Sequence, residues 1–358
     1  MNLSFNKLEG LSLHFSVSEV IEKAEAEVRG LYDPLDSGKY LYNAYYDCLG
    51  AGASYFLAYD DMLGYPFLQL LIKKEGETLG ELIVDASENP WSLSRYFNES
   101  ELKVINKTGL ASYREIFIEN SYGELNKIFP DTVIDLGMNA GFYSLLIGDR
   151  AKKYIGVEAD KRMLDIALTV NKRYGHRTYI HNNAFHSSSG EDIDFYPIEN
   201  LQHSSGGSLF SRTTPIKQGD SFLSPEKRTA DTRQGSSITV ETINLEDIVN
   251  FHNLDRIDLL KVDVEGAEQF LLEEPNLGII LSKVDMIVVE LHGGFIDMFK
   301  SNDLIVKAFS QERLFSPFKN LNIERADANY GQCFKFTKNN YSQGLDCLRH
   351  LNREETSL

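Results

Sequence analysis

Apolar and polar residues follow two different patterns along this chain, and the pattern changes near residue 110. Beyond that point, short apolar runs alternate with segments in which apolar residues recur at helical spacing. The runs predict strands at Thr132–Asp135, Lys153–Val157, Thr178–His181, Asp258–Val262 and Met286–Glu290. The intervening segments predict helices near Phe142–Arg150, Lys161–Tyr174, Ala267–Glu273 and Asp303–Glu312. Strands that alternate with helices indicate an α/β fold with parallel strands and right-handed crossovers.

In the first 110 residues one segment has helical spacing, and Leu79–Asp85 predicts a short strand. Ser18–Leu31 has a single apolar stripe at helical spacing, made of Val20, Ile21, Ala24 and Val28. We therefore expect a mainly helical N-terminal extension over residues 1–110, acting as a cap or a dimerisation arm of a homodimer. Many aromatic residues lie between Tyr32 and Phe67. They are suited either to stacking on sugar faces or to packing the extension against the main domain.

Residues 111–340 form the second region, which contains the strands and helices above. We expect additional strands in it. Asp192–Tyr196 and Ile238–Ile243 alternate as edge strands do, and Leu314–Lys319 with Cys333–Thr337 predicts a closing hairpin. Residues 204–237 are rich in Ser, Thr and Gly and carry several basic side chains. Because long loops inside compact domains are usually functional or mobile, we expect a mobile loop insertion there. Residues 341–358 are expected to form a C-terminal tail.

The most informative segment is Val133–Ser144, which reads VIDLGMNAGFYS. An apolar run ends in an acid, Asp135, and is followed by glycines at Gly137 and Gly141 and a helical pattern from Phe142 onward. A strand, a tight turn and a helix start in this order hold small cofactors against backbone N–H groups. A dinucleotide site reads G-x-G-x-x-G, whereas here an acid replaces the first glycine. Its charge would repel a pyrophosphate and favour a cationic ligand such as S-adenosylmethionine, which has a sulfonium and an ammonium group.

A second acid follows at a suitable distance. Glu158 ends the strand predicted at Lys153–Val157, and a carboxylate roughly 20 residues after the glycine turn can accept hydrogen bonds from ribose hydroxyls. Either acid taken alone could be a solvated residue at a strand end. Together with the turn they indicate an adenosine cofactor. An NAD-dependent oxidoreductase fits less well, because the third glycine is missing and Asp135 is present.

Two motifs resemble a known family. The turn over residues 135–141 resembles motif I of class I S-adenosylmethionine-dependent methyltransferases, and Leu259–Glu268, LLKVDVEGAE, is similar to the signature of their FkbM family. The resemblance spans roughly Tyr113–Lys338. It implies a doubly wound, mostly parallel, Rossmann-like sheet of seven strands whose last strand is antiparallel. Many members of this family are O-methyltransferases of sugars or other natural-product hydroxyls.

The resemblance also implies where S-adenosylmethionine binds. In the resembled fold the adenine lies at the end of the third strand, where Asn183 is placed to bond its exocyclic amine. The residues expected to bind the cofactor are Asp135, Gly137, Asn139, Gly141, Phe142, Glu158, Ala159, Asn183, Ala184 and Asp263.

Acidic residues and one histidine end the fourth and fifth predicted strands. Ligands of open α/β sheets bind at the carboxyl ends of the strands, so these residues are the candidates for chemistry. Asp263 would bond the methionine ammonium or orient the acceptor, and Glu265 would open the next helix, where its charge is favourable. His292 belongs to the residue type most often suited to general base catalysis, although a structural hydrogen bond is the alternative. The expected catalytic residues are therefore His292, Asp263 and Glu265.

The same cluster also offers ligands for a divalent cation. Asp263, Glu290 and His292 present oxygen and imidazole groups of the kinds that bind Mg²⁺ or Mn²⁺. Such an ion would acidify a bound hydroxyl. Their spacing is not that of a compact metal-binding motif. We therefore expect a base to assist the reaction first, and a metal ion as the second alternative.

Composition narrows the classes of partner and compartment. The formal net charge is −17, which argues against a nucleic-acid partner and against an anionic membrane surface. The 3 cysteines are scattered and form no C-x-x-C pair, which favours a reducing, cytoplasmic location and no disulfide framework. No apolar run reaches the length of a membrane span, and no secretory signal is visible.

These observations together predict a methyltransferase. We expect it to move a methyl group from S-adenosylmethionine to a hydroxyl of a small-molecule or carbohydrate acceptor, by in-line displacement with help from a base or a metal ion. Two alternatives stay open. One is a non-catalytic protein that binds an adenosine cofactor, and the other is a methyltransferase with a peptide or lipid acceptor.

Overall fold

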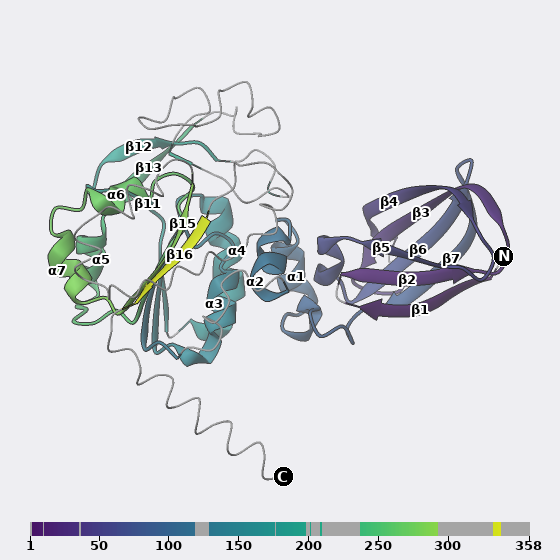
Figure 1. Ribbon diagram of the computed structural model, residues 1–358, viewed down its shortest axis with the longest axis horizontal. Coiled ribbons are helices and arrows are strands. Elements are labelled where there is room, and N and C mark those ends of the chain that lie inside the picture. Colours follow the sequence, from purple (N-terminus) through teal and green to yellow (C-terminus); the bar gives the residue numbers. More distant parts are fainter. Residues whose placement is uncertain are drawn as a thin grey trace, which may run out of the picture. The chain divides into compact units, whose positions relative to one another are not determined.

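A computed structural model describes residues 2–9, 11–35, 37–118, 129–175, 177–197, 201, 208–209, 237–292 and 332–337. The chain divides into two compact units (Figure 1). The N-terminal unit is Met1–Ile118 and the C-terminal unit is Glu119–Leu358.

The N-terminal unit contains two antiparallel sheets. One has the strand order β1-β2-β5, with β1 at Leu3–Glu9, β2 at Ser12–Val17 and β5 at Ser54–Ala58. The other has the order β4-β3-β6-β7, with β3 at Ile21–Leu31, β4 at Lys39–Leu49, β6 at Phe67–Lys74 and β7 at Glu77–Asp85. Side chains from both sheets form one buried core, to which Phe15, Val28, Leu57 and Leu70 belong. The unit is therefore a β-sandwich, in which each sheet covers the apolar face of the other.

Short helices complete this unit. They are η1 at Asp60–Gly64, η2 at Leu93–Arg95, α1 at Glu99–Ile105 and α2 at Ala111–Phe117. Asn98 caps α1 in a capping box with Glu101. The Asn106 side chain donates to the Gly64 carbonyl oxygen at 2.7 Å and to the Tyr32 hydroxyl at 3.1 Å. These two bonds connect the end of α1 with the sandwich.

The expectation of a mainly helical N-terminal extension is wrong. Ser18–Leu31 was expected to be a helix, but Ile21–Leu31 forms β3. Ala24 and Val28 face the core in the strand, as they would in a helix, and the segment is rich in Ala, Glu and Lys, which favour helices. The strand alternation is also interrupted at Lys23, whose φ is 51°. Pairing of β3 with β4 and β6 decides the structure, and those partners are distant in sequence.

The C-terminal unit is built on a sheet with the order β10-β9-β8-β14-β15-β16. The strands are β8 at Thr132–Leu136, β9 at Lys153–Val157, β10 at Thr178–His181, β14 at Leu259–Val262, β15 at Met286–Leu291 and β16 at Gln332–Thr337. The first five pair in parallel and β16 is antiparallel to β15. The expected parallel sheet and antiparallel last strand are therefore confirmed.

The sheet is described for six strands instead of the expected seven. The strand expected at Leu314–Lys319 and the helix expected at Asp303–Glu312 lie outside the described residues. The same is true of the tail at 341–358 and of nearly all of the loop at 204–237. The edge strands form a separate small sheet with the order β11-β13-β12, where β11 is Ala184–Phe185, β12 is Asp192–Phe195 and β13 is Ile238–Ile243.

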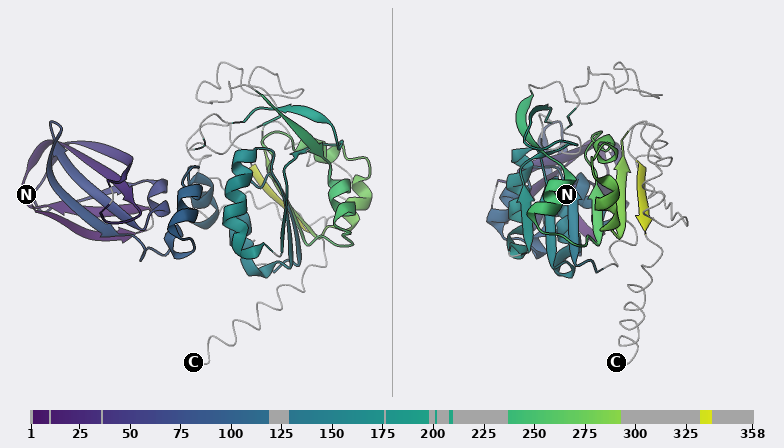
Figure 2. Two further views of the ribbon diagram at one scale, coloured as in Figure 1. Left: turned by 180° about the vertical axis from the view of Figure 1, so that it is seen from behind. Right: turned by 90° about the vertical axis from the view of Figure 1, so that its left-hand side faces the viewer.

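Helices lie on both faces of the main sheet (Figure 2). One face carries α3 at Phe142–Ile147 and α4 at Lys161–Asn171, and the other carries α5 at Leu245–Phe251 and α7 at Leu277–Ser282. The helices expected at Phe142–Arg150 and Lys161–Tyr174 begin where predicted, and their last turns are the 3₁₀ segments η4 at Gly148–Arg150 and η5 at Lys172–Tyr174. A core of strand and helix residues, among them Ile155, Leu260, Ile248 and Leu281, holds this layered arrangement together.

From the sequence we also expect no membrane-spanning segment. Within the described ranges, no helix is both long and apolar enough to cross a bilayer.

The sandwich offers a test of its packing at Gly30. A Cβ built there would lie 2.4 Å from two ring atoms of Tyr65, whose side chain is buried. We expect Gly30→Ala to lower the free energy of unfolding of the N-terminal unit by about 1–3 kcal/mol, because the ring or the strand must move. Urea denaturation measures this change.

Gly50→Ala is the matched control for that substitution. Its nearest contact would be the Tyr55 hydroxyl at 3.6 Å, an ordinary van der Waals distance. The control should change stability by no more than about 0.5 kcal/mol. Equal effects of the two alanines would contradict the packing described at Gly30.

Candidate functional site

The turn between β8 and α3 has the geometry that its two glycines require. Gly137 has a φ of 79°, and a Cβ there would lie 1.7 Å from the Asp263 carbonyl oxygen. Gly141 has a φ of 80°, and its Cβ would lie 2.8 Å from the Asn171 side chain. Both positions therefore need glycine for the backbone conformation and for the close approach of neighbouring segments. The turn is held against the end of β14 on one side and against α4 on the other.

Glu158 connects this turn with the end of β9. Its Oε2 accepts a hydrogen bond from the Asn139 backbone N–H at 2.7 Å, and its Oε1 accepts one from Asp160 N–H at 2.8 Å. Asn139 itself has a left-handed backbone, with a φ of 53°. Burial raises the pKa of Glu158 to about 7, although these two backbone hydrogen bonds lower it. The site thus contains a carboxyl group that changes charge near neutral pH.

Asp135 lies inside the structure and is paired with a lysine. Its side chain is fully buried, and Lys261 Nζ lies 3.0 Å from its Oδ1. The Tyr154 hydroxyl donates to its other carboxylate oxygen. Asp135 and Lys261 face each other because they are register partners in the parallel pair of β8 and β14. We expected this carboxylate to attract a cationic ligand, and in the structure its cationic neighbour is Lys261.

Lys261 was not anticipated from the sequence, although a lysine within the apolar run LLKV is itself unusual. Its ammonium lies 3.3 Å from Asp263 Oδ2 and 3.4 Å from the Gly137 carbonyl oxygen. Burial alone would lower the pKa of Lys261, but Asp135 and Asp263 raise it above its ordinary value. The buried cation therefore holds together the end of β8, the glycine turn and the residue that follows β14.

The loop after β14 contains two glutamates, Glu268 and Glu265, in different environments. Glu268 is fully buried and accepts hydrogen bonds from the Val264 and Gly266 backbone N–H groups, each at 3.2 Å. Glu265 does not open a helix as expected, because α6 spans Gln269–Leu272. It lies in the turn before that helix with a φ of 51°. A left-handed backbone at a residue other than glycine is uncommon and is often found at functional sites.

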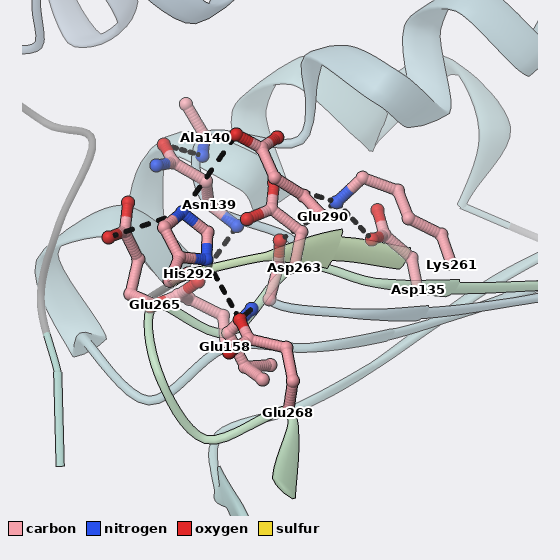
Figure 3. Close-up of polar contacts among 12 residues, drawn as sticks. Asp135, Asn139, Ala140, Glu158, Lys261, Asp263, Glu265, Glu268, Glu290 and His292 are labelled. Carbon is pink, nitrogen blue, oxygen red and sulfur yellow. Dashed lines mark hydrogen bonds and ion pairs between the residues drawn. The ribbon is translucent and has the colours of Figure 1, made fainter. Parts of the chain in front are cut away.

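His292 lies among three glutamates at the end of β15 (Figure 3). Its Nδ1 is 2.9 Å from Glu268 Oε1, and its Nε2 is 3.6 Å from Glu265 Oε2 and 3.9 Å from Glu290 Oε1. Burial would lower the pKa of His292, but these glutamates raise it well above its ordinary value. The ring is therefore held as an imidazolium. A cation of this kind donates protons, so the arrangement does not favour the general-base role that we expected for His292.

The remaining expected cofactor residues lie along the same edge of the sheet. Phe142 begins α3 and Ala184 begins β11, and both side chains are buried. Asn183 follows β10 and donates to the Glu241 carbonyl oxygen at 3.2 Å. Its neighbour Asn182 donates to the carbonyl oxygens of Glu158 and Ala159 at 2.9 and 3.1 Å. The carboxyl ends of the parallel strands thus bring these residues to one edge, as open α/β sheets do.

The expected metal site is not supported. Within the described ranges, no group of three or more His, Cys, Asp or Glu side chains is arranged to hold a metal ion. One expected ligand also has another partner, because Asp263 lies 3.3 Å from the Lys261 ammonium.

A comparison with protein families matches this region. A family model described as Methyltransferase FkbM domain covers residues 135–317, about half of the chain. The match includes the glycine turn, the loop after β14 and the end of β15.

Two curated relatives are similar over about half of this chain. The AMB antimetabolite synthetase AmbE of Pseudomonas aeruginosa is 28% identical over 204 residues, which are 50% of this chain and 9% of AmbE. Methyltransferase sdnD of Sordaria araneosa is 30% identical over 190 residues, which are 45% of this chain and 66% of sdnD. This chain therefore spans less than two thirds of the length of either relative.

Solved structures similar to this chain are distant from it. Methyltransferase FkbM from Methylobacillus flagellatus has 12% identity and a TM-score of 0.33, covering 68% of this chain and 56% of that chain. TrmK of M. capricolum, solved with S-adenosyl-homocysteine, has 15% identity and a TM-score of 0.30, covering 63% of this chain and 69% of that chain.

The family model thus spans the residues that build the site, from Asp135 at the end of β8 to His292 beyond β15. The chain belongs to the FkbM family of methyltransferases.

Proposed function

We propose that the C-terminal unit uses S-adenosylmethionine to methylate a hydroxyl of a sugar or related natural product. The observation that carries the proposal is the glycine turn, whose Asn139 amide is bonded at 2.7 Å to the carboxyl group of Glu158 at the next strand end. A tight turn beside an acid at the end of the second strand is the arrangement that binds an adenosine moiety.

The chemistry of these residues fits S-adenosylmethionine. Gly137 and Gly141 allow the left-handed backbone of the turn and its close packing against the end of β14 and against α4. Glu158 would accept hydrogen bonds from the ribose hydroxyls, and Asn183 would bond the adenine. Asp263, whose side chain is 24% exposed beyond the Lys261 pair, would bond the methionine ammonium. When bound, the cofactor supplies a methyl group on a cationic sulfur.

The glutamates around His292 are suited to accept the proton of the acceptor hydroxyl. An acceptor hydroxyl must lose its proton as its oxygen attacks the methyl carbon. We assign the proton-accepting role to Glu265, whose side chain is 22% exposed and lies 3.6 Å from the imidazolium. His292 then acts as a positioning residue, because its positive charge holds Glu265 and Glu290 near each other at the strand ends.

The family and the relatives support a natural-product acceptor. One relative is named as an antimetabolite synthetase and the other as a methyltransferase. The acidic edge of the sheet favours an uncharged or cationic acceptor over a phosphorylated one.

The first experiment on this proposal is thermal unfolding with S-adenosylmethionine, S-adenosylhomocysteine and NAD in turn. A ligand at 100 times its dissociation constant stabilises the protein by about 2.7 kcal/mol. We expect a higher melting temperature with the first two ligands only. A second experiment tests the acceptor, by measuring transfer of a labelled methyl group to a panel of sugars. Stabilisation by NAD alone would refute the cofactor, and binding without transfer to any sugar, peptide or lipid would refute catalysis.

Glu158 predicts how cofactor affinity depends on pH. Only the ionised carboxyl accepts hydrogen bonds with both oxygens, and its pKa is about 7. Affinity for S-adenosylhomocysteine should therefore rise as the pH increases through about 7 and level off above it, with up to a tenfold change per pH unit below the pKa. Calorimetry from pH 5.5 to 8.5 measures this dependence.

Two variants test whether Glu158, and not another carboxyl group, causes the pH dependence of cofactor affinity. Glu158→Gln should bind more weakly and show a flat pH profile. Asp165→Asn, at an exposed position on α4, should keep the profile of the parent protein. A parent affinity that does not change between pH 6 and 8 would contradict the role of Glu158.

His292 should carry a positive charge at neutral pH. Long-range proton–nitrogen NMR distinguishes an imidazolium from either neutral tautomer, and we expect His292 to give the imidazolium pattern at pH 7.5. His252 is an internal control, because burial, His181 and Lys153 lower its pKa to about 4. Assignment comes from His292→Gln. A neutral pattern for His292 at pH 7.5 would contradict the charge described here.

A further inference from the structure

The outer face of the four-stranded sheet in the N-terminal unit has a defined pattern of side chains. On β3, Ala24, Ala26 and Val28 face the core, so the residues between and beyond them face outward. Register partners on neighbouring strands share a face. The outer face therefore includes three cross-strand rows, which are Tyr40, Arg29, Gln69 and Ile83; Asn43, Glu27, Leu71 and Glu81; and Tyr45, Glu25, Lys73 and Thr78.

Two tyrosines on the edge strand β4 are open to solvent on this face. Tyr45 is 75% exposed and Tyr40 is 53% exposed. The Tyr40 hydroxyl donates to Asn43 Oδ1 at 2.9 Å, and Asn43 Nδ2 donates to the Tyr45 hydroxyl at 3.0 Å. Since both hydroxyls reach the same residue of the same strand, both rings lean along the strand toward Asn43. Rings held in this way present one broad surface to solvent.

Polar groups beside the rings are held in place by one another. Asn43 Nδ2 also donates to Glu25 Oε1 at 2.8 Å. Glu27 accepts from Arg29 at 2.6 Å and from Lys73 at 2.5 Å. Burial would raise the pKa of Glu27, but the hydrogen bonds from Lys73 and Arg29 lower it, so it stays ionised. Fixed donors and acceptors lose little conformational entropy when a ligand binds.

The charges within these three rows nearly cancel. Glu25, Glu27 and Glu81 stand against Arg29 and Lys73, and opposite charges lie next to each other. Such a face has no strong field of one sign, so it does not select a polyanion or a polycation. Exposed tyrosine rings beside fixed amide and carboxylate groups instead match a ligand with apolar C–H faces and many hydroxyls.

We propose that this outer face binds an uncharged oligosaccharide or polysaccharide. The rings of Tyr40 and Tyr45 would stack on sugar rings, and Asn43 and Glu25 would bond their hydroxyls. Tyr40 and Tyr45 share this face because a bulge shifts the register between β3 and β4, and the ligand that we propose for the two rings together is a chain of sugars. This site is separate from the cofactor residues and does not depend on methyl transfer.

Native gel electrophoresis of the whole chain in gels that contain an uncharged polysaccharide tests the proposal. The probes are hydroxyethyl cellulose, xylan, galactomannan and dextran, each compared with a gel that contains no polysaccharide. We expect at least one of them to retard the protein, with no effect of saturating S-adenosylhomocysteine. Tyr45→Ala and Asn43→Ala should each weaken the affinity about tenfold, which is about 1.4 kcal/mol.

Phe56→Ala is the matched control. Phe56 is 61% exposed and lies on β5 in the other sheet, next to His14. Its removal should leave retardation unchanged, and circular dichroism checks that every variant is folded. The proposal is overturned if none of the four polysaccharides retards the protein, or if Tyr45→Ala and Asn43→Ala are retarded as strongly as the parent.

Discussion

The buried ion pair between Lys261 and Asp135 is the interaction on which the rest of the site depends. Their atoms lie 3.0 Å apart at the centre of the sheet, where an unpaired charge would be very unfavourable. The same ammonium reaches Asp263 and the Gly137 carbonyl oxygen. The Lys261 ammonium therefore connects the pairing of β8 with β14, the glycine turn and the loop after β14. Loss of the lysine would leave the buried Asp135 carboxylate with the Tyr154 hydroxyl but without its cation, and the turn without the ammonium that supports it.

A second cation organises the neighbouring strand ends. His292 lies near Glu265, Glu268 and Glu290, and those groups raise its pKa well above its ordinary value. Glu268 in turn accepts two backbone N–H groups of the loop after β14. The two cations thus hold an otherwise self-repelling set of carboxylates at one edge of the sheet. This concentration of negative charge suits a cofactor that carries two positive groups.

Local signals in the sequence predicted the parallel strands of the C-terminal unit that the structure describes. Apolar runs and glycines determine where β8, β9, β10 and α3 begin, because these features act over a few residues. The pairing of Asp135 with Lys261 was not predicted, since the two residues are 126 positions apart and only the sheet brings their strands together. The N-terminal sandwich was missed for the same reason. Ala24 and Val28 fit a helix or a strand equally well, and only pairing with β4 and β6 distinguishes the two.

The backbone at Glu265 combines a conformational cost with the carboxylate that we propose as the proton acceptor. A left-handed φ of 51° at a side-chain-bearing residue costs roughly 1–2 kcal/mol compared with a right-handed one. Glycine would remove that cost, yet it would also remove the carboxylate next to His292. Replacement of Glu265 by glycine would therefore exchange backbone strain for the loss of this carboxylate. Engineering for thermostability should leave this position untouched, even though it is one of the places where stability would be easiest to gain.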